Sequence, residues 1–193
     1  YEHLESAIHL NASVHYLFAN FMGVGIQYSL LDSQFEGENY QLLNTGYPIY
    51  LSTNSRISQY INFVGPSFLF RQYLSKKRKI QLTETLSGGL VTYRNEEQST
   101  IDTPSESYYN TNSYNILATG RSIGANIGLS AEYFVLPYLS IGVGGNFMYG
   151  LINKMSFELK SSDGSQQQTQ NSQLQNALDL THFDYSLVFR FHL

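Results

Sequence analysis

Seven ionisable side chains stand out because they occupy the polar positions of segments that otherwise carry little charge: His9, His15, Arg71, Glu132, Asp184, Arg190 and His192. Imidazole, carboxylate and guanidinium groups can form ion pairs, bind metals or transfer protons. Because charges that are buried need partners of opposite sign, we expect the two acidic members to pair with the two arginines. The set is therefore interpreted as a structural polar network.

A metal site or a catalytic centre would need a closer grouping. His9 and His15 are six residues apart along one strand face, which is too far for them to share a metal ion without other partners. Serine, histidine and glutamate can form a hydrolytic triad, but no spacing in this sequence selects one. We expect a non-enzymatic protein with no catalytic, metal-binding or cofactor-binding residues.

The composition is unusual for a soluble protein. Of 193 residues, 13% are charged and 15% are aromatic, whereas soluble domains carry roughly 25% charged residues. The formal net charge of −4 and a single short basic run, "KKRK" at 76–79, argue against a nucleic-acid partner. Without cysteine the chain has neither disulfides nor thiolate metal ligands. No linker-like stretch divides it, so residues 1–193 are predicted to form one domain.

The ionisable residues belong to segments in which apolar and polar residues alternate. In "FDYSLVFRFHL" (183–193) every odd position is apolar or aromatic, and the even positions include Asp184, Arg190 and His192. A period of two predicts a strand with two unlike faces. The same alternation marks six further strands, at 8–18, 22–30, the second half of 57–74, 80–90, 123–135 and 139–151.

The connections between these seven strands alternate in length. Short turns are expected near Ala19, Lys77 and Pro137, and long polar loops at about 32–56, 95–114 and 160–178. The glutamine-rich stretch from Ser161 to Asn176 is interpreted as a flexible loop. Connections that are alternately long and short are typical of an up-and-down transmembrane barrel.

The composition of the polar face of the strands indicates whether the apolar face contacts lipid or a protein core. The polar face consists mainly of Gly, Ser, Asn and Gln, which suit a crowded interior better than a soluble exterior. Residues 133–153 carry no charge, but Pro137 and the period of two oppose a transmembrane helix there. The fold class predicted is all-β: an antiparallel up-and-down transmembrane β-barrel with its apolar face toward lipid.

Three segments carry a resemblance to a known family: "VGPSFLFR", "IGLSAEYFVLPYLSIGVGGNFMYG" and the terminal "YSLVFRFHL". The chain resembles, over nearly its whole length, the small outer-membrane β-barrel proteins of Gram-negative bacteria, the OmpA/OmpX-like and outer membrane protein beta-barrel domain families. The resemblance implies a bacterial outer-membrane location and a structural, adhesion or complex-forming role. It also implies that the last strand is an insertion signal, formed by Tyr185, Leu187, Phe189, Phe191 and Leu193.

The partners implied by the resemblance are outer-membrane lipid and lipopolysaccharide, the barrel-assembly machinery during insertion, and other outer-membrane or periplasmic proteins. Small family members have eight strands with both chain ends in the periplasm, so their first connection is long. Here the first hairpin has a short turn near Ala19, which predicts that its first strand is the second of eight and that one strand lies before Tyr1. The alternative functions are a narrow porin-like channel and a soluble lipocalin-like small-molecule-binding barrel.

Overall fold

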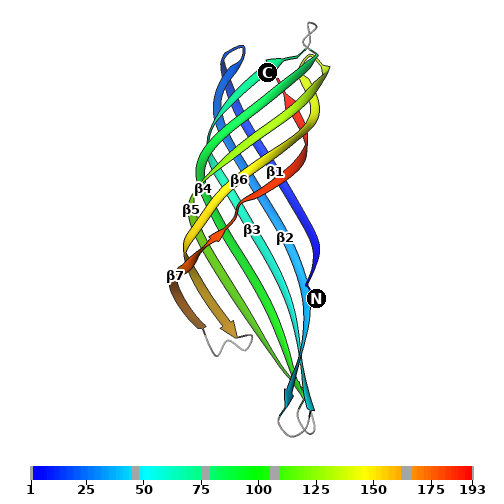
Figure 1. The fold of residues 1–193 in the computed structure, drawn as a ribbon, viewed down its shortest axis with the longest axis vertical. Coiled ribbons are helices and arrows are strands. Elements are labelled where there is room, and N and C mark those ends of the chain that lie inside the picture. Colours follow the sequence, from blue (N-terminus) through cyan, green and yellow to red (C-terminus); the bar gives the residue numbers. More distant parts are fainter. Residues whose placement is uncertain (1, 45–47, 75–78, 105–108, 162–166, 193) are drawn as a thin grey trace.

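The computed structural model describes residues 2–44, 48–74, 79–104, 109–161 and 167–192, and it is all-β and antiparallel, as predicted (Figure 1). In this described part, no helix is both long and apolar enough to cross a membrane. The sheet has eight strands: β1 (Glu2–Ala19), β2 (Met22–Asn44), β3 (Pro48–Tyr73), β4 (Ile80–Pro104), β5 (Tyr109–Leu136), β6 (Leu139–Ser161), β7 (Gln167–Asp179) and β8 (His182–Phe191).

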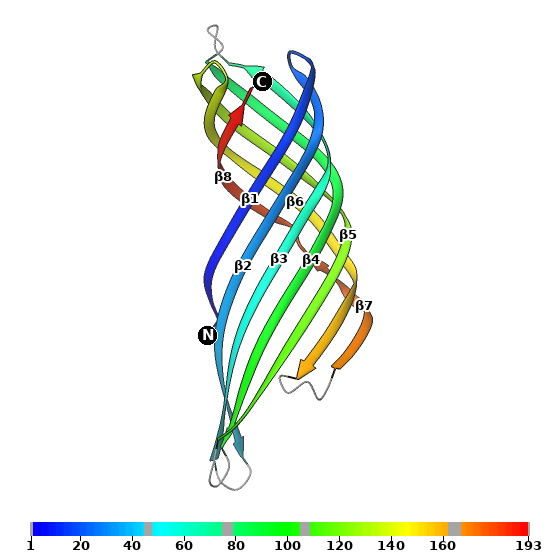
Figure 2. The same cartoon turned by 180° about the vertical axis from the view of Figure 1, so that it is seen from behind.

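The strands follow one another around a curled sheet (Figures 1 and 2). Each strand from β1 to β6 pairs with the next, and β6 then pairs with both β7 and β8. β8 pairs with the first half of β6, from Leu139 to Met148, and β7 pairs with the second half, up to Lys160. β7 and β8 therefore lie end to end as one pass along β6.

A short break separates these two pieces. The backbone N–H of Thr181 donates to Asp179 Oδ1 at 2.8 Å, and the N–H of Leu180 donates to the carbonyl of Gly150 at 2.9 Å. An Asp side chain that bonds to the backbone two residues later is a common turn device. It interrupts the ladder with β6 and places Leu180 in the interior, where the residue is 6% exposed.

The two outer edges of the sheet are formed by β1 and by the β7–β8 pass, and no backbone ladder joins β1 to β8 among the described residues. β1 and β8 both run toward the end that carries the short turns, so they point the same way.

Three of the predicted loops are largely strand. Pairing of β2 with β3 continues to Asn44 and Pro48, and pairing of β4 with β5 continues to Pro104 and Tyr109. The predictions of long loops at 32–56 and 95–114 were therefore wrong. The flexible loop predicted for 161–176 was wrong from Gln167 onward, where β7 begins, and residues 162–166 lie outside the described part. The described chain has eight strands, and because β7 and β8 form one pass along β6, they make the seven passes counted from the sequence. A hairpin ladder needs only backbone groups, so polar side chains on both faces do not end it.

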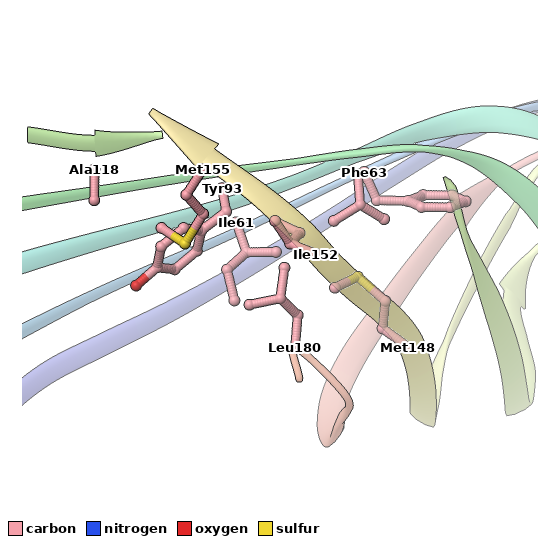
Figure 3. Close-up of a cluster of buried hydrophobic side chains, with 9 residues drawn as sticks. Ile61, Phe63, Tyr93, Ala118, Met148, Ile152, Met155 and Leu180 are labelled. Carbon is pink, nitrogen blue, oxygen red and sulfur yellow. The ribbon is translucent and has the colours of Figure 1, made fainter. Parts of the chain in front are cut away.

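The interior holds an apolar cluster that the sequence analysis did not foresee (Figure 3). Its buried members come from β3, β4, β5, β6 and the break between β7 and β8: Ile61, Phe63, Val91, Tyr93, Ala118, Met148, Ile152, Met155 and Leu180. Phe63, Val91 and Ile152 are 0% exposed. These side chains fill the inside of the curled sheet next to polar residues, because Phe63 lies opposite Ser29 and Met148 lies opposite His182.

Candidate functional site in the polar interior

Glu132 is the centre of the strongest polar network in the interior. It is 1% exposed, and its carboxylate accepts hydrogen bonds from Gln81 Nε2 at 2.8 Å, Ser130 Oγ at 2.8 Å and Ser140 Oγ at 2.6 Å. Arg190 adds an ion pair, with Nη2 3.0 Å from Oε1 and Nε 3.1 Å from both oxygens. A buried carboxylate with this many donors is fully compensated, which is what a structural ion pair requires.

The strand register assembles this network. Glu132 of β5 lies opposite Gln81 of β4 and Gly142 of β6. A Cβ atom on Gly142 would lie 2.1 Å from the carbonyl oxygen of Ala131, so only glycine allows β6 to approach β5 this closely. Two residues away on the same face, Ser140 pairs with Arg190 of β8. The glycine therefore brings the Arg190 side chain within reach of the carboxylate.

A second, neutral network crosses the interior from β2 to β5. Gln27 donates through Nε2 to Asn126 Oδ1 at 3.1 Å and to Asn11 Oδ1 at 3.2 Å. Ser87 Oγ lies 2.7 Å from Gln27 Oε1 and 3.1 Å from the carbonyl oxygen of Asn126. Gln27 and Asn126 are 2% and 0% exposed. The side chains of this network and of the Glu132 network together fill part of the interior.

Two histidines and an aspartate form a third group, which we call the histidine cluster: His9, His182 and Asp184. His9 Nδ1 lies 2.9 Å from Asp184 Oδ1, and the His9 and His182 rings meet edge to face with centroids 5.9 Å apart. On its other side, His9 Nε2 lies 2.6 Å from Ser29 Oγ. Asn146 Nδ2 donates to Asp184 Oδ1 at 3.1 Å.

The order Ser29, His9, Asp184 is that of a hydrolytic triad, but the surroundings do not suit acyl transfer. Ser29 is 2% exposed. It lies in β2 opposite Asn11 of β1 and Phe63 of β3, so the neighbouring backbone N–H groups belong to sheet ladders on both sides. An oxyanion hole needs free N–H donors aimed at the reacting carbonyl. The arrangement favours a structural or binding role for these three side chains.

The structure separates some of the residues that the sequence analysis grouped. Arg71 reaches neither acidic residue; its Nε donates to the carbonyl of Asn20 at 2.7 Å and its guanidinium lies 5.5 Å from the centre of the Tyr73 ring. The expected pairing of Arg71 with an interior carboxylate was therefore wrong. It lies near the end of β3, where its backbone N–H also donates to the carbonyl of Phe21 in the β1–β2 turn, at 3.0 Å.

The remaining predicted residues have other partners. His15 Nε2 lies 2.6 Å from Ser67 Oγ, and His192 Nε2 lies 3.0 Å from Ser140 Oγ. The predicted insertion-signal residues Tyr185, Leu187, Phe189 and Phe191 are all exposed on the outer face of β8. The fifth, Leu193, lies outside the described residues.

The site residues predicted from the sequence do not include the polar partners in these networks, among them Gln81, Ser130, Ser140 and His182. For His182 a signal was available, because it precedes Asp184 by two residues and so shares its face of the strand. For the serines and the glutamine no such signal existed, since polar residues fill most inner-face positions.

A cavity of about 420 Å³ lies away from these networks, on the extended part of β4, β5 and β6. It is lined by Gln98, Ser99, Thr100, Ser113, Tyr114, Asn115 and Lys160. The charged member, Lys160, has Nζ 3.1 Å from Glu158 Oε1. The lining groups are mostly hydroxyls and amides, which suit a hydrated surface better than a catalytic pocket.

Neither a protein-family model nor a curated protein matches this chain. A functional assignment must therefore rest on the distribution of its residues and on the three interior networks.

Proposed function

We propose that this chain is an integral β-barrel protein of the bacterial outer membrane, non-enzymatic and with a filled interior, in a structural, adhesion or complex-forming role. One observation carries the proposal: the usual distribution of polar and apolar residues is inverted. Tyr185 and Val14 are 87% and 81% exposed, whereas Glu132 and Asn126 are 1% and 0% exposed. Apolar side chains outside and polar ones inside are the arrangement of a transmembrane barrel.

The extent of the outer apolar surface supports the membrane proposal. Soluble monomers rarely expose a contiguous apolar patch larger than a few hundred Å². Here exposed large apolar residues occur on every strand from β1 to β6 and on β8, including Leu10, Ile26, Phe68, Leu86, Ile127, Val143 and Leu187. A soluble lipocalin-like barrel would require these side chains to line the inside.

The height of this surface fits a membrane. Phe183 and Phe191, both exposed on β8, are eight residues apart. At roughly 3.3 Å per residue and about 40° of tilt, they are separated by about 20 Å along the barrel axis, close to the roughly 25 Å of a typical apolar band. Exposed Tyr16, Phe18 and Tyr133 lie toward the short-turn end, and exposed Tyr28 and Tyr149 toward the other. Such aromatic girdles are typical of both membrane interfaces.

The extended hairpins provide the surface for an adhesion or complex-forming role. β2 continues to Asn44, although its pairing with β1 ends at Gly37. Figure 1 shows β2 to β5 reaching well past the ends of β6 and β7, at the end opposite the short turns. A paired sheet that projects from a membrane is a rigid surface on which a partner protein can dock.

The membrane proposal predicts how the protein behaves on extraction and on a gel. The folded chain is expected to need detergent for solubility, because its apolar outer face must stay covered. Without boiling, its band in SDS is expected to migrate differently from the boiled chain, since the compact barrel binds less detergent. A chain that is soluble in plain buffer and shows no mobility difference would contradict the proposal.

Because its interior is filled, we expect the barrel not to conduct ions. The apolar cluster and the Glu132 and Gln27 networks occupy the interior at different levels, so the purified protein is expected to show no steady conductance in a planar bilayer. The variant Phe63→Ala/Met148→Ala/Ile152→Ala removes three fully or almost fully buried side chains but leaves both polar networks in place, so it is expected to stay non-conducting. Steady open steps from the unmodified protein would instead support the narrow porin-like channel.

A further inference from the structure

We propose that the histidine cluster, His9, His182 and Asp184, is a binding site for a divalent transition-metal cation, with Zn²⁺ the best match. One ligand atom from each residue lies within 4.8 Å of the other two. His9 belongs to β1 and the other two to β8. Imidazole nitrogen and carboxylate oxygen are established zinc ligands, and the chain contains no cysteine that could compete for the ion.

His182 is held in the tautomer that a metal ligand needs. Its Nδ1 lies 2.9 Å from the carbonyl oxygen of Leu180. A carbonyl oxygen can only accept, so Nδ1 carries the hydrogen and Nε2 of the neutral ring keeps its lone pair. This Nε2 is buried, and no group of the described residues forms a hydrogen bond with it. A backbone carbonyl that orients the ring in this way is the usual second contact of a metal-binding histidine.

Asp184 also has an unused oxygen. Its Oδ1 accepts from Asn146 Nδ2 at 3.1 Å, which orients the carboxylate. Its Oδ2 is buried and, within the part of the chain that the structure describes, has no partner. An unsatisfied buried carboxylate oxygen is costly. A cation between Asp184 Oδ2 and His182 Nε2 would satisfy both atoms together.

His9 completes the set through its contact with Ser29. When His9 Nε2–H donates to Ser29 Oγ, at 2.6 Å, the Nδ1 lone pair faces Asp184. His9 Nδ1 and Asp184 Oδ1 are 2.9 Å apart. In this arrangement the two lone pairs face each other and repel, and a metal ion between them would remove the repulsion; when Ser29 Oγ donates to Nε2 instead, Nδ1–H of neutral His9 donates to Asp184. The two unsatisfied atoms beside them favour the metal, because one proton on His9 would leave both without a partner.

The geometry suits a small transition-metal cation with one free position. Tetrahedral Zn²⁺ with bonds of about 2.1 Å holds its ligand atoms about 3.4 Å apart. Small side-chain rotations would bring the present separations to that value. The side chains of His9 and Asp184 are 11% and 14% exposed, so an ion can reach them from solvent. Ca²⁺ and Mg²⁺ prefer oxygen ligands and are not expected to bind.

A metal at this position would connect the two edges of the sheet. Because no backbone ladder joins β1 to β8 among the described residues, side chains such as those of the histidine cluster provide the contacts between them. A ligand that binds only the folded chain stabilises it by mass action. Zn²⁺ is therefore expected to raise the temperature at which the unboiled gel band is lost.

The test is a zinc titration of the full chain, folded in detergent and freed of metal by a chelator. Zn²⁺ affinity is measured by competition with a fluorescent zinc indicator, and we expect a single site per chain that Ca²⁺ and Mg²⁺ do not fill. His182→Gln and Asp184→Asn each remove a ligand. We expect them to weaken binding by at least the roughly 10- to 100-fold that loss of an outer-shell contact costs.

His15→Gln is the matched control. His15 is on the same strand as His9, is half-buried and contacts Ser67 as His9 contacts Ser29, but it lies outside the cluster. It is expected to bind zinc like the unmodified chain, and gel mobility confirms that each variant is folded. No zinc binding by the unmodified chain, or an equal loss in His15→Gln, would show that the cluster is only an ion pair. Because the titration reports on the interior, its outcome is independent of the membrane proposal.

Discussion

Leu187→Arg is expected to destabilise the protein folded in a bilayer by about 2–4 kcal/mol. Leu187 is 73% exposed on the outer face of β8. It lies midway between Phe183 and Phe191, which places it near the midplane of the apolar band. A guanidinium at that depth loses its hydration. The change is measured by titrating folded protein in lipid vesicles with urea and following the unboiled gel band.

Asn171→Arg provides the matched control for this variant. Asn171 is also exposed, but it lies on β7, outside the stretch from Phe183 to Phe191. Arginine there stays hydrated, so a change of less than about 0.5 kcal/mol is expected. If Leu187→Arg were as well tolerated as Asn171→Arg, the outer face of β8 would be a water-exposed surface and the membrane proposal would fail.

Glu132→Ala is expected to destabilise the fold by about 3 kcal/mol. Removing one member of a buried ion pair typically costs about 3–5 kcal/mol, because the other charge is left without a partner. The Arg190 side chain is 21% exposed, so water compensates part of this charge and the lower end of the range applies. The hydroxyls of Ser130 and Ser140 lose their acceptor as well. The urea titration used for Leu187→Arg measures the difference.

The double variant Glu132→Ala/Arg190→Ala separates the ion pair from the packing around it. With both charges removed, no uncompensated charge remains, so the double variant is expected to be more stable than Glu132→Ala alone. A sum of the two single effects, with no recovery, would mean that the 3.0 Å contact contributes nothing specific to the stability of the fold.

The sequence predicted the strand class and the two unlike faces well, and the connections poorly. The alternation of 183–193 reappears in β8, where every second residue is exposed from Phe183 onward. The stretch 161–176 was interpreted as a loop because glutamine and serine fill both of its faces, yet part of it became β7. Periodicity detects a strand only where the two faces differ. Polar hairpins held by backbone hydrogen bonds leave no such pattern.

The partners within the interior depended on the tertiary structure. By sequence, Arg71 and Arg190 were equivalent candidates for Glu132, and only Arg190 reaches it, since Gly142 lets β6 approach β5 and the β6–β8 register sets Arg190 opposite Ser140. Within the segments that alternate clearly, the sequence by itself determined which side chains face inward, because alternation is a local property of an extended backbone. Which inward side chains meet was decided only by the stagger between strands far apart in the chain.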